Sequence, residues 1–308
     1  MNLGARVTRL PGTARLSAIA AAAAALLGLA ACAPQDNGAG SASSSSPTAS
    51  GSAAAASCAP GALRTQTAGT LTIGTDNPAY DPWFQDNKPS SGKGFESAVA
   101  YAVAKQLGYP TDKVAWTTVP FNNAITPGVK KFDFDINQVS ISDERRQAVD
   151  FSSGYYDVRQ AVVTLKDSKY AGATTVAALK GAKIGAQVGT TGLTVVQKTV
   201  KPTQQPSVFD TTDLASAALK NKQIDAIVVD LPTAFYITSV QVPDAKVVGQ
   251  FPADAATGSA EQFGLVLTKG SPLTTCVSQA VDALRADGTL ARLAKQWLPA
   301  SDTAAVLK

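Results

Sequence analysis

The chain has 308 residues, of which 45% are hydrophobic and 16% charged, and this length is enough for two modest globular domains. It contains no histidine, which excludes Ser-His-Asp and Cys-His nucleophile systems, His-ligated metals and imidazole acid–base chemistry. Its three cysteines are too few for a four-thiolate zinc or iron–sulfur site, so we expect neither a metal nor a cofactor. The remaining classes are a secreted binding protein and an enzyme that uses carboxylates.

The formal net charge of +4 overstates the basicity of the mature chain. Arg6, Arg9 and Arg15 lie in a predicted targeting segment, and without them 24 basic residues face 23 acidic ones. A protein that binds nucleic acid through phosphate neutralisation would be more basic. We therefore expect no nucleic-acid partner.

Residues 1–31 are typical of a secretory signal peptide. A basic, acid-free start is followed by an apolar run of Ala and Leu that ends in Leu29-Ala30-Ala31-Cys32. The run is too short and too rich in alanine for a membrane span. Its last four residues match the lipobox of bacterial lipoproteins, which predicts that Cys32 becomes the acylated first residue. The alternative is an ordinary signal peptide followed by a chance cysteine.

The segment after Cys32 is predicted to be a flexible tether. Residues 33–57 are rich in Ser, Ala and Gly and almost free of large apolar side chains, so they cannot form a core. We assign 32–69 to the lipidated cysteine and this tether. Acyl chains and tether together would hold the protein at the cell membrane, on its extracytoplasmic face.

Cys58 and Cys276 are the remaining cysteines, one before the first predicted strand and the other at the start of a late helix. In an oxidising compartment we expect them to form a disulfide that closes a very long loop. Two free thiols are the alternative.

From residue 70 the chain alternates between predicted strands and helices. Short apolar runs between turn residues predict strands at 71–74, 114–119, 132–137, 183–186 and 224–229. Apolar positions with helical spacing predict helices at 94–107, after 190–192, from about 212, at 277–284 and at 290–297. This alternation predicts an α/β fold with parallel sheets, divided into two lobes of roughly a hundred residues each.

Two segments could bind an anion. Arg145 follows a predicted strand, within Ser140-Ile141-Ser142-Asp143-Glu144-Arg145, and lies where a helix should begin. Its guanidinium could form two parallel bonds to a carboxylate, although a surface arginine is the alternative. Gly189-Thr190-Thr191-Gly192 joins a strand to a helix, where exposed N–H groups favour an anion; a plain turn is the alternative.

Two acids could bind a cation. Asp230 follows a continuous apolar strand, at the edge of the sheet where open α/β folds bind ligands. It could hold an ammonium group, or only start the turn before Pro232. Asp76 follows the first strand, with Tyr80 and Trp83 nearby, and an acid beside an aromatic ring suits a polar or cationic side chain. A capping aspartate in a proline-rich loop is the alternative.

The order of these pieces resembles a known family, the amino-acid-binding proteins of bacterial ATP-binding-cassette (ABC) importers, similar to the glutamine- and histidine-binding proteins. The resemblance covers about residues 70–298. It is carried by Thr75-Asp76, Pro82-Trp83-Phe84, Gly94-Phe95-Glu96, Phe132-Asp133, the segment 140–145, Val149-Asp150-Phe151-Ser152, Tyr155-Tyr156, Gly189-Thr190-Thr191 and Val229-Asp230.

The resemblance implies a two-lobed periplasmic-binding-protein-like fold of type II, with parallel-rich sheets and a two-strand hinge. Lobe 1 would span 70–160 and return with 265–308, and lobe 2 would span 165–258. The strands near 162–165 and 264–267 would join the lobes, which would close on the ligand.

The resemblance also implies how the backbone groups of an amino acid are bound. Arg145 would bind the α-carboxylate, helped by Ser140 and by the backbone at Thr190 and Thr191. Asp230 would bind the α-ammonium group.

Five further residues would surround the ligand side chain. Tyr80 and Phe121 would enclose it, Asp76 would bind its tip, and Gln138 and Gln187 would tune specificity. Gln138 stands where the family usually has Gly or Ser, and its longer side chain could fill part of the pocket, so the ligand could be smaller than expected or not a standard amino acid.

These features predict a non-catalytic lipoprotein, monomeric, that delivers a polar amino acid (glutamine, histidine or a basic one) to an ABC permease in the membrane. One alternative is an enzyme on the same fold, similar to cyclohexadienyl dehydratase. Asp76 and Glu96 are the only acids that the sequence places near the cleft mouth, and Glu96 is more readily explained as a helix N-terminal residue. Another alternative is a ligand sensor that works with a separate signalling chain.

Overall fold

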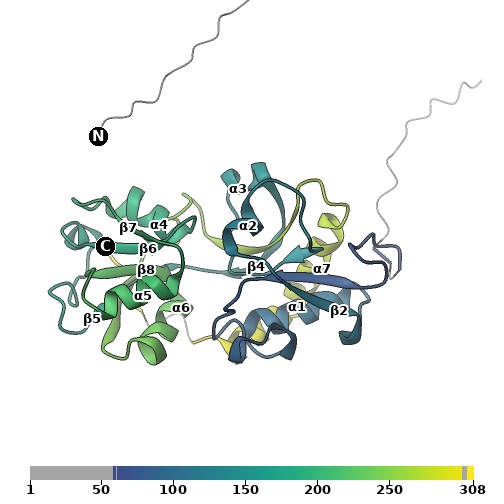
Figure 1. Cartoon of the computed structure of the whole chain (residues 1–308), viewed down its shortest axis with the longest axis horizontal. Coiled ribbons are helices and arrows are strands. Elements are labelled where there is room, and N and C mark those ends of the chain that lie inside the picture. The colour runs from purple at the N-terminus through teal and green to yellow at the C-terminus, as the bar shows by residue number, and fades with distance from the viewer. Residues whose placement is uncertain (1–57, 60, 300–303) are drawn as a thin grey trace, which may run out of the picture. The chain divides into compact units, whose positions relative to one another are not determined.

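The described chain forms two lobes, each built around a five-stranded sheet (Figure 1). The structure is a computed structural model that describes residues 58–59, 61–299 and 304–308. The predicted signal peptide 1–31, Cys32 and residues 33–57 of the predicted tether lie outside the described residues. Within the described ranges, no helix is long and apolar enough to cross a membrane.

Lobe 1 contains a mixed sheet with the strand order β2-β1-β3-β10-β4. Its strands are β1 (Leu71–Thr75), β2 (Val114–Thr118), β3 (Phe134–Asp135), β4 (Val149–Asp157) and β10 (Gln262–Thr268). β1 runs parallel to β2 and β3, whereas β10 runs antiparallel to β3 and β4. Its helices are α1 (Phe95–Gln106), α2 (Phe121–Ile125), α3 (Asp143–Ala148), α7 (Thr274–Ala286) and α8 (Thr289–Trp297).

The core of lobe 1 is an aromatic cluster under the start of α1. Trp83 is fully buried, and its ring centroid lies 6.0 Å from that of Phe95 and 5.6 Å from that of Phe263. Gly94 allows this packing, because its φ of 95° is left-handed and a Cβ there would lie 2.4 Å from the carbonyl oxygen of Trp83. The Nε1 of Trp83 donates to Oγ1 of Thr233 in lobe 2 at 3.0 Å, so the cluster also ties the lobes together.

Lobe 2 contains the second mixed sheet, with the order β7-β6-β8-β5-β9. Its strands are β5 (Gln160–Leu165), β6 (Ile184–Gln187), β7 (Ser207–Phe209), β8 (Ala226–Asp230) and β9 (Ala245–Gln250). Its helices are α4 (Thr191–Val195), α5 (Thr212–Lys220) and α6 (Leu231–Tyr236). Each sheet combines parallel and antiparallel pairs, because β5 and β10 follow a crossing from the other lobe and run against their neighbours.

The chain crosses between the lobes at 158–159 and again at 251–261. The strands predicted as the hinge, near 162–165 and 264–267, are instead interior strands of the two sheets, β5 and β10. Their uniform burial explains the continuous apolar runs in the sequence. The two crossings are paired through their backbones: the N–H of Val158 donates to the oxygen of Glu261 at 3.0 Å, and that of Phe251 to the oxygen of Gln160 at 2.8 Å.

Both ends of the described chain correct the expected boundaries. Residues 61–69, assigned to the tether, lie on lobe 1, where the N–H of Gln66 donates to Oδ1 of Asp133 at 2.7 Å. Cys58 and Cys276 are joined by a disulfide, with their Cα atoms 5.3 Å apart. Residues 304–308, assigned to lobe 1, lie on lobe 2, where the N–H of Leu307 donates to the oxygen of Gln250 at 2.9 Å.

Leu307 anchors this last segment in the core of lobe 2, where it is 2% exposed. We expect Leu307→Ala to lower the free energy of unfolding by about 2–5 kcal/mol, because it leaves a cavity in a packed core. The matched control is Val306→Ala at its neighbour, which is 47% exposed and should change stability by less than about 0.5 kcal/mol. Urea denaturation measures both variants, and equal effects would contradict the assigned packing.

Candidate functional site

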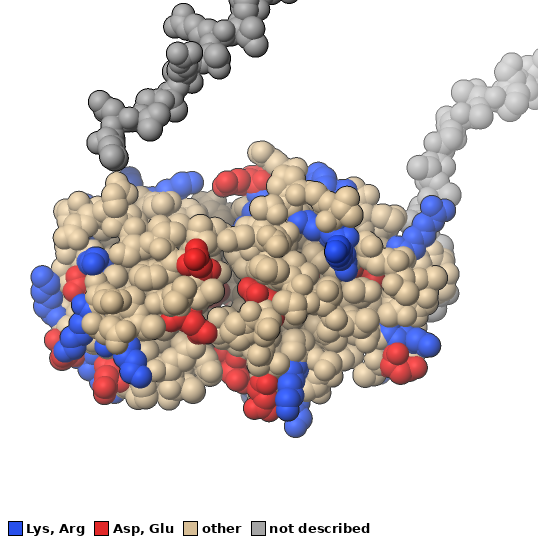
Figure 2. Space-filling model, viewed as in Figure 1, with Lys and Arg blue, Asp and Glu red and all other residues tan. Residues whose placement is uncertain are grey.

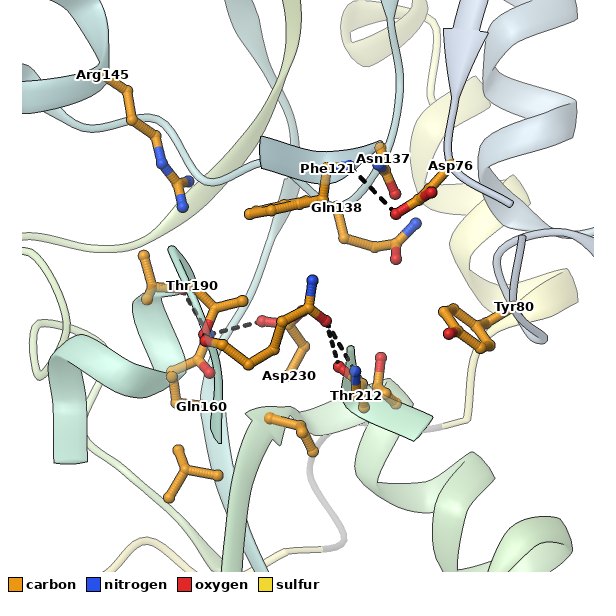
Figure 3. Close-up of a pocket in the computed structure, with 16 residues that line it drawn as sticks. Asp76, Tyr80, Phe121, Asn137, Gln138, Arg145, Gln160, Thr190, Thr212 and Asp230 are labelled. Carbon is orange, nitrogen blue, oxygen red and sulfur yellow. Dashed lines mark hydrogen bonds between the residues drawn. The ribbon is translucent and has the colours of Figure 1, made fainter. Parts of the chain in front are cut away.

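A cavity of about 70 Å³ lies between the lobes, at the carboxyl ends of β1, β6 and β8 (Figure 3). It is lined by Asp76, Tyr80, Phe121, Asn137, Gln138, Arg145, Gln160, Gln187, Thr190, Thr191, Gly192, Thr212, Val228, Val229, Asp230 and Thr233. The structure thus brings together nine of the ten residues predicted from the sequence. The tenth, Ser140, is buried and is not part of the lining.

Arg145 bridges the lobes on one side of this cavity. It lies in the first turn of α3, whose N-cap residue Ser142 accepts a bond from the N–H of Arg145 at 3.2 Å. Its Nη1 donates to the oxygen of Ser140 at 2.6 Å and its Nη2 to the oxygen of Gly189 in lobe 2 at 2.8 Å. The guanidinium also lies 5.6 Å from the ring centroid of Phe121. Two of its five N–H groups are used by these carbonyls, and three remain for a carboxylate.

The turn opposite Arg145 depends on Gly189 and Thr190. Gly189 has a φ of 75°, and a Cβ there would lie 2.5 Å from Oδ1 of Asn122 in lobe 1. The Oγ1 of Thr190 donates to the oxygen of Gln187 at 2.7 Å and accepts from the N–H of Leu193 at 3.2 Å. Because the one proton of this hydroxyl is used by Gln187, only the backbone N–H of Thr190 can donate a hydrogen bond to a ligand.

A buried polar network forms the floor of the cavity. The Oγ of Ser140 donates to Oε1 of Glu261, and the Nε2 of Gln160 donates to Oδ1 of Asp230 at 2.6 Å and to Oγ1 of Thr191 at 3.1 Å. The same Nε2 lies 3.2 and 3.3 Å from the two carboxylate oxygens of Glu261. The proton of the Ser140 hydroxyl is therefore used by Glu261. The expected help of Ser140 in binding the ligand carboxylate stays a prediction.

Sequence reasoning missed Gln160 and Glu261. Each lies at the end of a crossing between the lobes, and they are 101 positions apart in the chain. No local sequence pattern links two residues so far apart, and each alone is only a polar residue beside an apolar strand. Only the pairing of the crossings shows that they belong to one site.

Asp230 ends β8 on the opposite side of the cavity from Arg145. Desolvation and the neighbouring carboxylate of Glu261 raise the pKa of Asp230 to about 8, against the opposing bond from Gln160 and the charge of Arg145. An ammonium group at this position would stabilise the ionised form. Binding of such a group at neutral pH would therefore release a proton.

The far end of the cavity presents polar groups from both lobes. Asp76 accepts from the N–H of Phe121 at 3.2 Å and from that of Asn77 at 2.7 Å. The Oε1 of Gln187 accepts from the N–H and Oγ1 of Thr212 at 2.9 and 2.8 Å, which leaves its Nε2 to meet a ligand. Figure 2 shows acidic side chains along the boundary of the lobes on this face.

Two further acids are buried behind the cavity. Glu96 is fully buried on α1 and accepts from the N–H of Gln138 at 2.7 Å, from Nε2 of Gln138 and from the hydroxyl of Tyr155. Burial raises its pKa to about 7. Its burial corrects the placement of an acid near the cleft mouth, whereas its place in the first turn of α1 confirms the preferred explanation as a helix N-terminal residue. Asp135 is also fully buried, and its two carboxylate oxygens have no hydrogen-bond partner among the described residues. Desolvation raises its pKa well above the usual range. Within the described ranges, no three Cys, Asp or Glu side chains are grouped so that they could hold a metal ion.

Comparison with known proteins assigns the chain to a family. Residues 71–300 match the family model of the bacterial extracellular solute-binding proteins, family 3. The chain belongs to this family. Its two-lobed α/β architecture agrees with the type II fold expected from the sequence.

Three relatives of this solute-binding protein show the range of the similarity. A probable histidine-binding protein of Campylobacter jejuni is 31% identical over 235 residues, which are 75% of this chain and 86% of the relative. The structure of an ancestral arginine-binding protein bound to arginine has 32% identity and a TM-score of 0.60, and covers 74% of this chain and 98% of its own. The ancestral amino-acid-binding protein AncCDT-1, a precursor of cyclohexadienyl dehydratase, has 27% identity and a TM-score of 0.61, with coverages of 75% and 96%.

The buried acids predict a pH dependence of stability. Glu96, Asp135 and Asp230 all have raised pKa values in the fold, so between pH 5 and 8 the folded state binds more protons than the unfolded state. Stability should therefore fall as pH rises through this window, by at most about 1.4 kcal/mol per pH unit for each group. No histidine titrates in the same range.

Urea denaturation of the ligand-free protein at pH 5, 6.5 and 8 measures this slope. Asp230→Asn should flatten it, since the amide does not titrate. Asp254→Asn, at an exposed acid of the second crossing, should leave the slope unchanged. An unliganded protein equally stable at pH 5 and pH 8 would contradict the raised pKa values.

Proposed function

We propose that this protein captures an amino acid with a polar side chain between its lobes and delivers it to an ABC permease. The observation that carries the proposal is the placement of Arg145 in lobe 1 and Asp230 in lobe 2 on one cavity between the lobes. An amino acid is a zwitterion, and this pair offers a cation to its carboxylate and an acid to its ammonium group. Because each partner comes from a different lobe, full binding requires closure.

The side-chain end of the cavity supports a polar ligand. Asp76 offers carboxylate oxygens and Gln187 an amide nitrogen, beside the ring of Tyr80. Burial, together with Asp213 and Asp76, raises the pKa of Tyr80, so its phenol stays neutral. The histidine and arginine in the names of the relatives are ligands of this kind, and glutamine would also satisfy these groups.

We propose binding rather than catalysis for this cleft. Three of its buried acids are engaged by neighbouring side chains: Glu96 by Gln138 and Tyr155, Glu261 by Ser140, and Asp230 by Gln160. The carboxylate of Asp135 has no such partner, but Asp135 does not line the cavity. A dehydratase similar to cyclohexadienyl dehydratase would instead turn over prephenate or arogenate, and incubation with either compound separates the two functions. A sensor would bind the same ligand but would present its closed form to a signalling chain rather than to a permease.

The ligand is identified by calorimetry with the standard amino acids, on protein that has been unfolded and refolded to remove any bound ligand. We expect one or a few polar amino acids to bind. Arg145→Lys should weaken their binding by about 2–5 kcal/mol, because lysine cannot form two parallel hydrogen bonds to the ligand carboxylate and leaves it poorly paired. Arg146→Lys is the matched control, since Arg146 lies 5.7 Å from the ring centroid of Phe151 and outside the cavity. Unchanged affinity in Arg145→Lys would refute the assigned role of Arg145.

We also propose that Cys32 is acylated and anchors the protein on the outer face of the membrane. The motif Leu29-Ala30-Ala31-Cys32 and the Ser- and Ala-rich segment after it support this anchor. Cells fed a fatty-acid probe should label the protein, and Cys32→Ala should abolish the label and release the protein from the membrane fraction. Ser43→Ala serves as the control within the tether. Undiminished label in Cys32→Ala would refute the anchor.

A further inference from the structure

Gln138 is held in an unusual conformation at the edge of the ligand cavity. Its φ of 49° lies in the left-handed region, which few residues other than glycine adopt. Its backbone N–H donates to Oε1 of Glu96 at 2.7 Å, and its side-chain Nε2 donates to Oε2 of the same carboxylate. One buried acid therefore holds both the backbone and the side chain of Gln138, and these two bonds offset the strain of the left-handed conformation.

The partner carboxylate is itself fixed. Glu96 is fully buried in the first turn of α1 and accepts a third bond from the hydroxyl of Tyr155, which is 2% exposed. An ionised carboxylate only accepts hydrogen bonds, so the amide group of Gln138 must turn its nitrogen toward Glu96. The amide oxygen is then the polar atom left for the cavity, and Figure 3 shows this oxygen facing the open centre, between Phe121 and Tyr80.

We propose that Glu96 is a positioning residue that determines ligand specificity by fixing the amide of Gln138 with its oxygen in the cavity. This inference rests on the proposed binding of an amino acid. The oxygen of Gln138 adds to the carboxylate oxygens of Asp76 at the same end of the cavity, so two hydrogen-bond acceptors face the ligand side chain. The pocket therefore selects amino acids whose side chains donate hydrogen bonds, with an ammonium, guanidinium, imidazole or amide N–H group.

The variant Glu96→Gln tests this directly. A neutral amide at position 96 has its own NH₂ group, and two NH₂ groups cannot face each other favourably. The amide of Gln138 is then free to rotate and to place its nitrogen in the cavity, where it repels a donor. The measured quantity is the ratio of two binding affinities. The first is for the amino acid that binds most tightly among those with a side-chain N–H group, and the second is for a matched analogue without such a group. The analogue is norleucine for lysine or arginine, methionine for glutamine, and phenylalanine for histidine.

We expect Glu96→Gln to lower this ratio at least about tenfold at pH 8, where the carboxylate of Glu96, with a pKa of about 7, is ionised. Glu144→Gln makes the same chemical change at an exposed residue of the same lobe and should leave the ratio unchanged. A general loss of packing would weaken both ligands of a pair alike, so the ratio separates positioning from a structural effect.

Gln138→Met keeps the length of the side chain but removes the acceptor, so it tests the proposal even where Glu96→Gln does not fold. It should lower the ratio by a similar factor, and the double variant should show no further loss, because both changes act through one group. A ratio within twofold of the original in Gln138→Met overturns the inference, as does a wild-type protein that prefers the analogue. A wild-type protein that binds no amino acid refutes the proposed function itself.

Discussion

Removal of charged groups from water is the constraint on which this cleft depends. Arg145, Asp230, Glu261 and Glu96 lie in or against the cavity between the lobes, and an isolated buried charge there would cost several kcal/mol or more. Each has a protein partner that reduces this cost. Arg145 donates to carbonyl oxygens of both lobes, and each of the three carboxylates accepts from at least one side chain. Among the described residues, no ion pair joins Arg145 directly to Asp230, which leaves both groups able to pair with a ligand.

The two crossings between the lobes do more than connect them. Gln160 and Glu261 end these crossings and meet under the cavity, where Gln160 donates to Asp230 and Glu261 accepts from Ser140. Asp230, which we propose to bind the ligand ammonium group, is in this way hydrogen-bonded to the end of the first crossing. The end of the second crossing is hydrogen-bonded to Ser140, in the loop that leads to Arg145. The charge of Glu261 helps to raise the pKa of Asp230, because the two carboxylates repel each other across the amide of Gln160.

The two ends of the cavity differ in how they are held. Around Arg145 the polar contacts are made by backbone carbonyls and by an N-cap, which are common to many sequences. Around Gln138 they are made by particular side chains, Glu96 and Tyr155, buried in the core of lobe 1. We infer that the first end binds what all amino acids share and that the second distinguishes among them.

By itself, the sequence determined the elements whose signals are local. The periodicity of α1 and the buried run of β8 predicted an α/β fold of two lobes. The order of motifs from Asp76 to Asp230 carried the resemblance to the amino-acid-binding proteins, and this resemblance implied nine of the residues that line the cavity. Only the tertiary structure decided where the crossings lie, that Leu307 packs in lobe 2, that Ser140 serves Glu261, and that Glu96 holds Gln138. The reason is physical: helix and strand periodicity depends on neighbours a few residues apart, whereas these contacts join residues between 42 and 121 positions apart, or a chain end to a distant sheet, and no local pattern records such pairs.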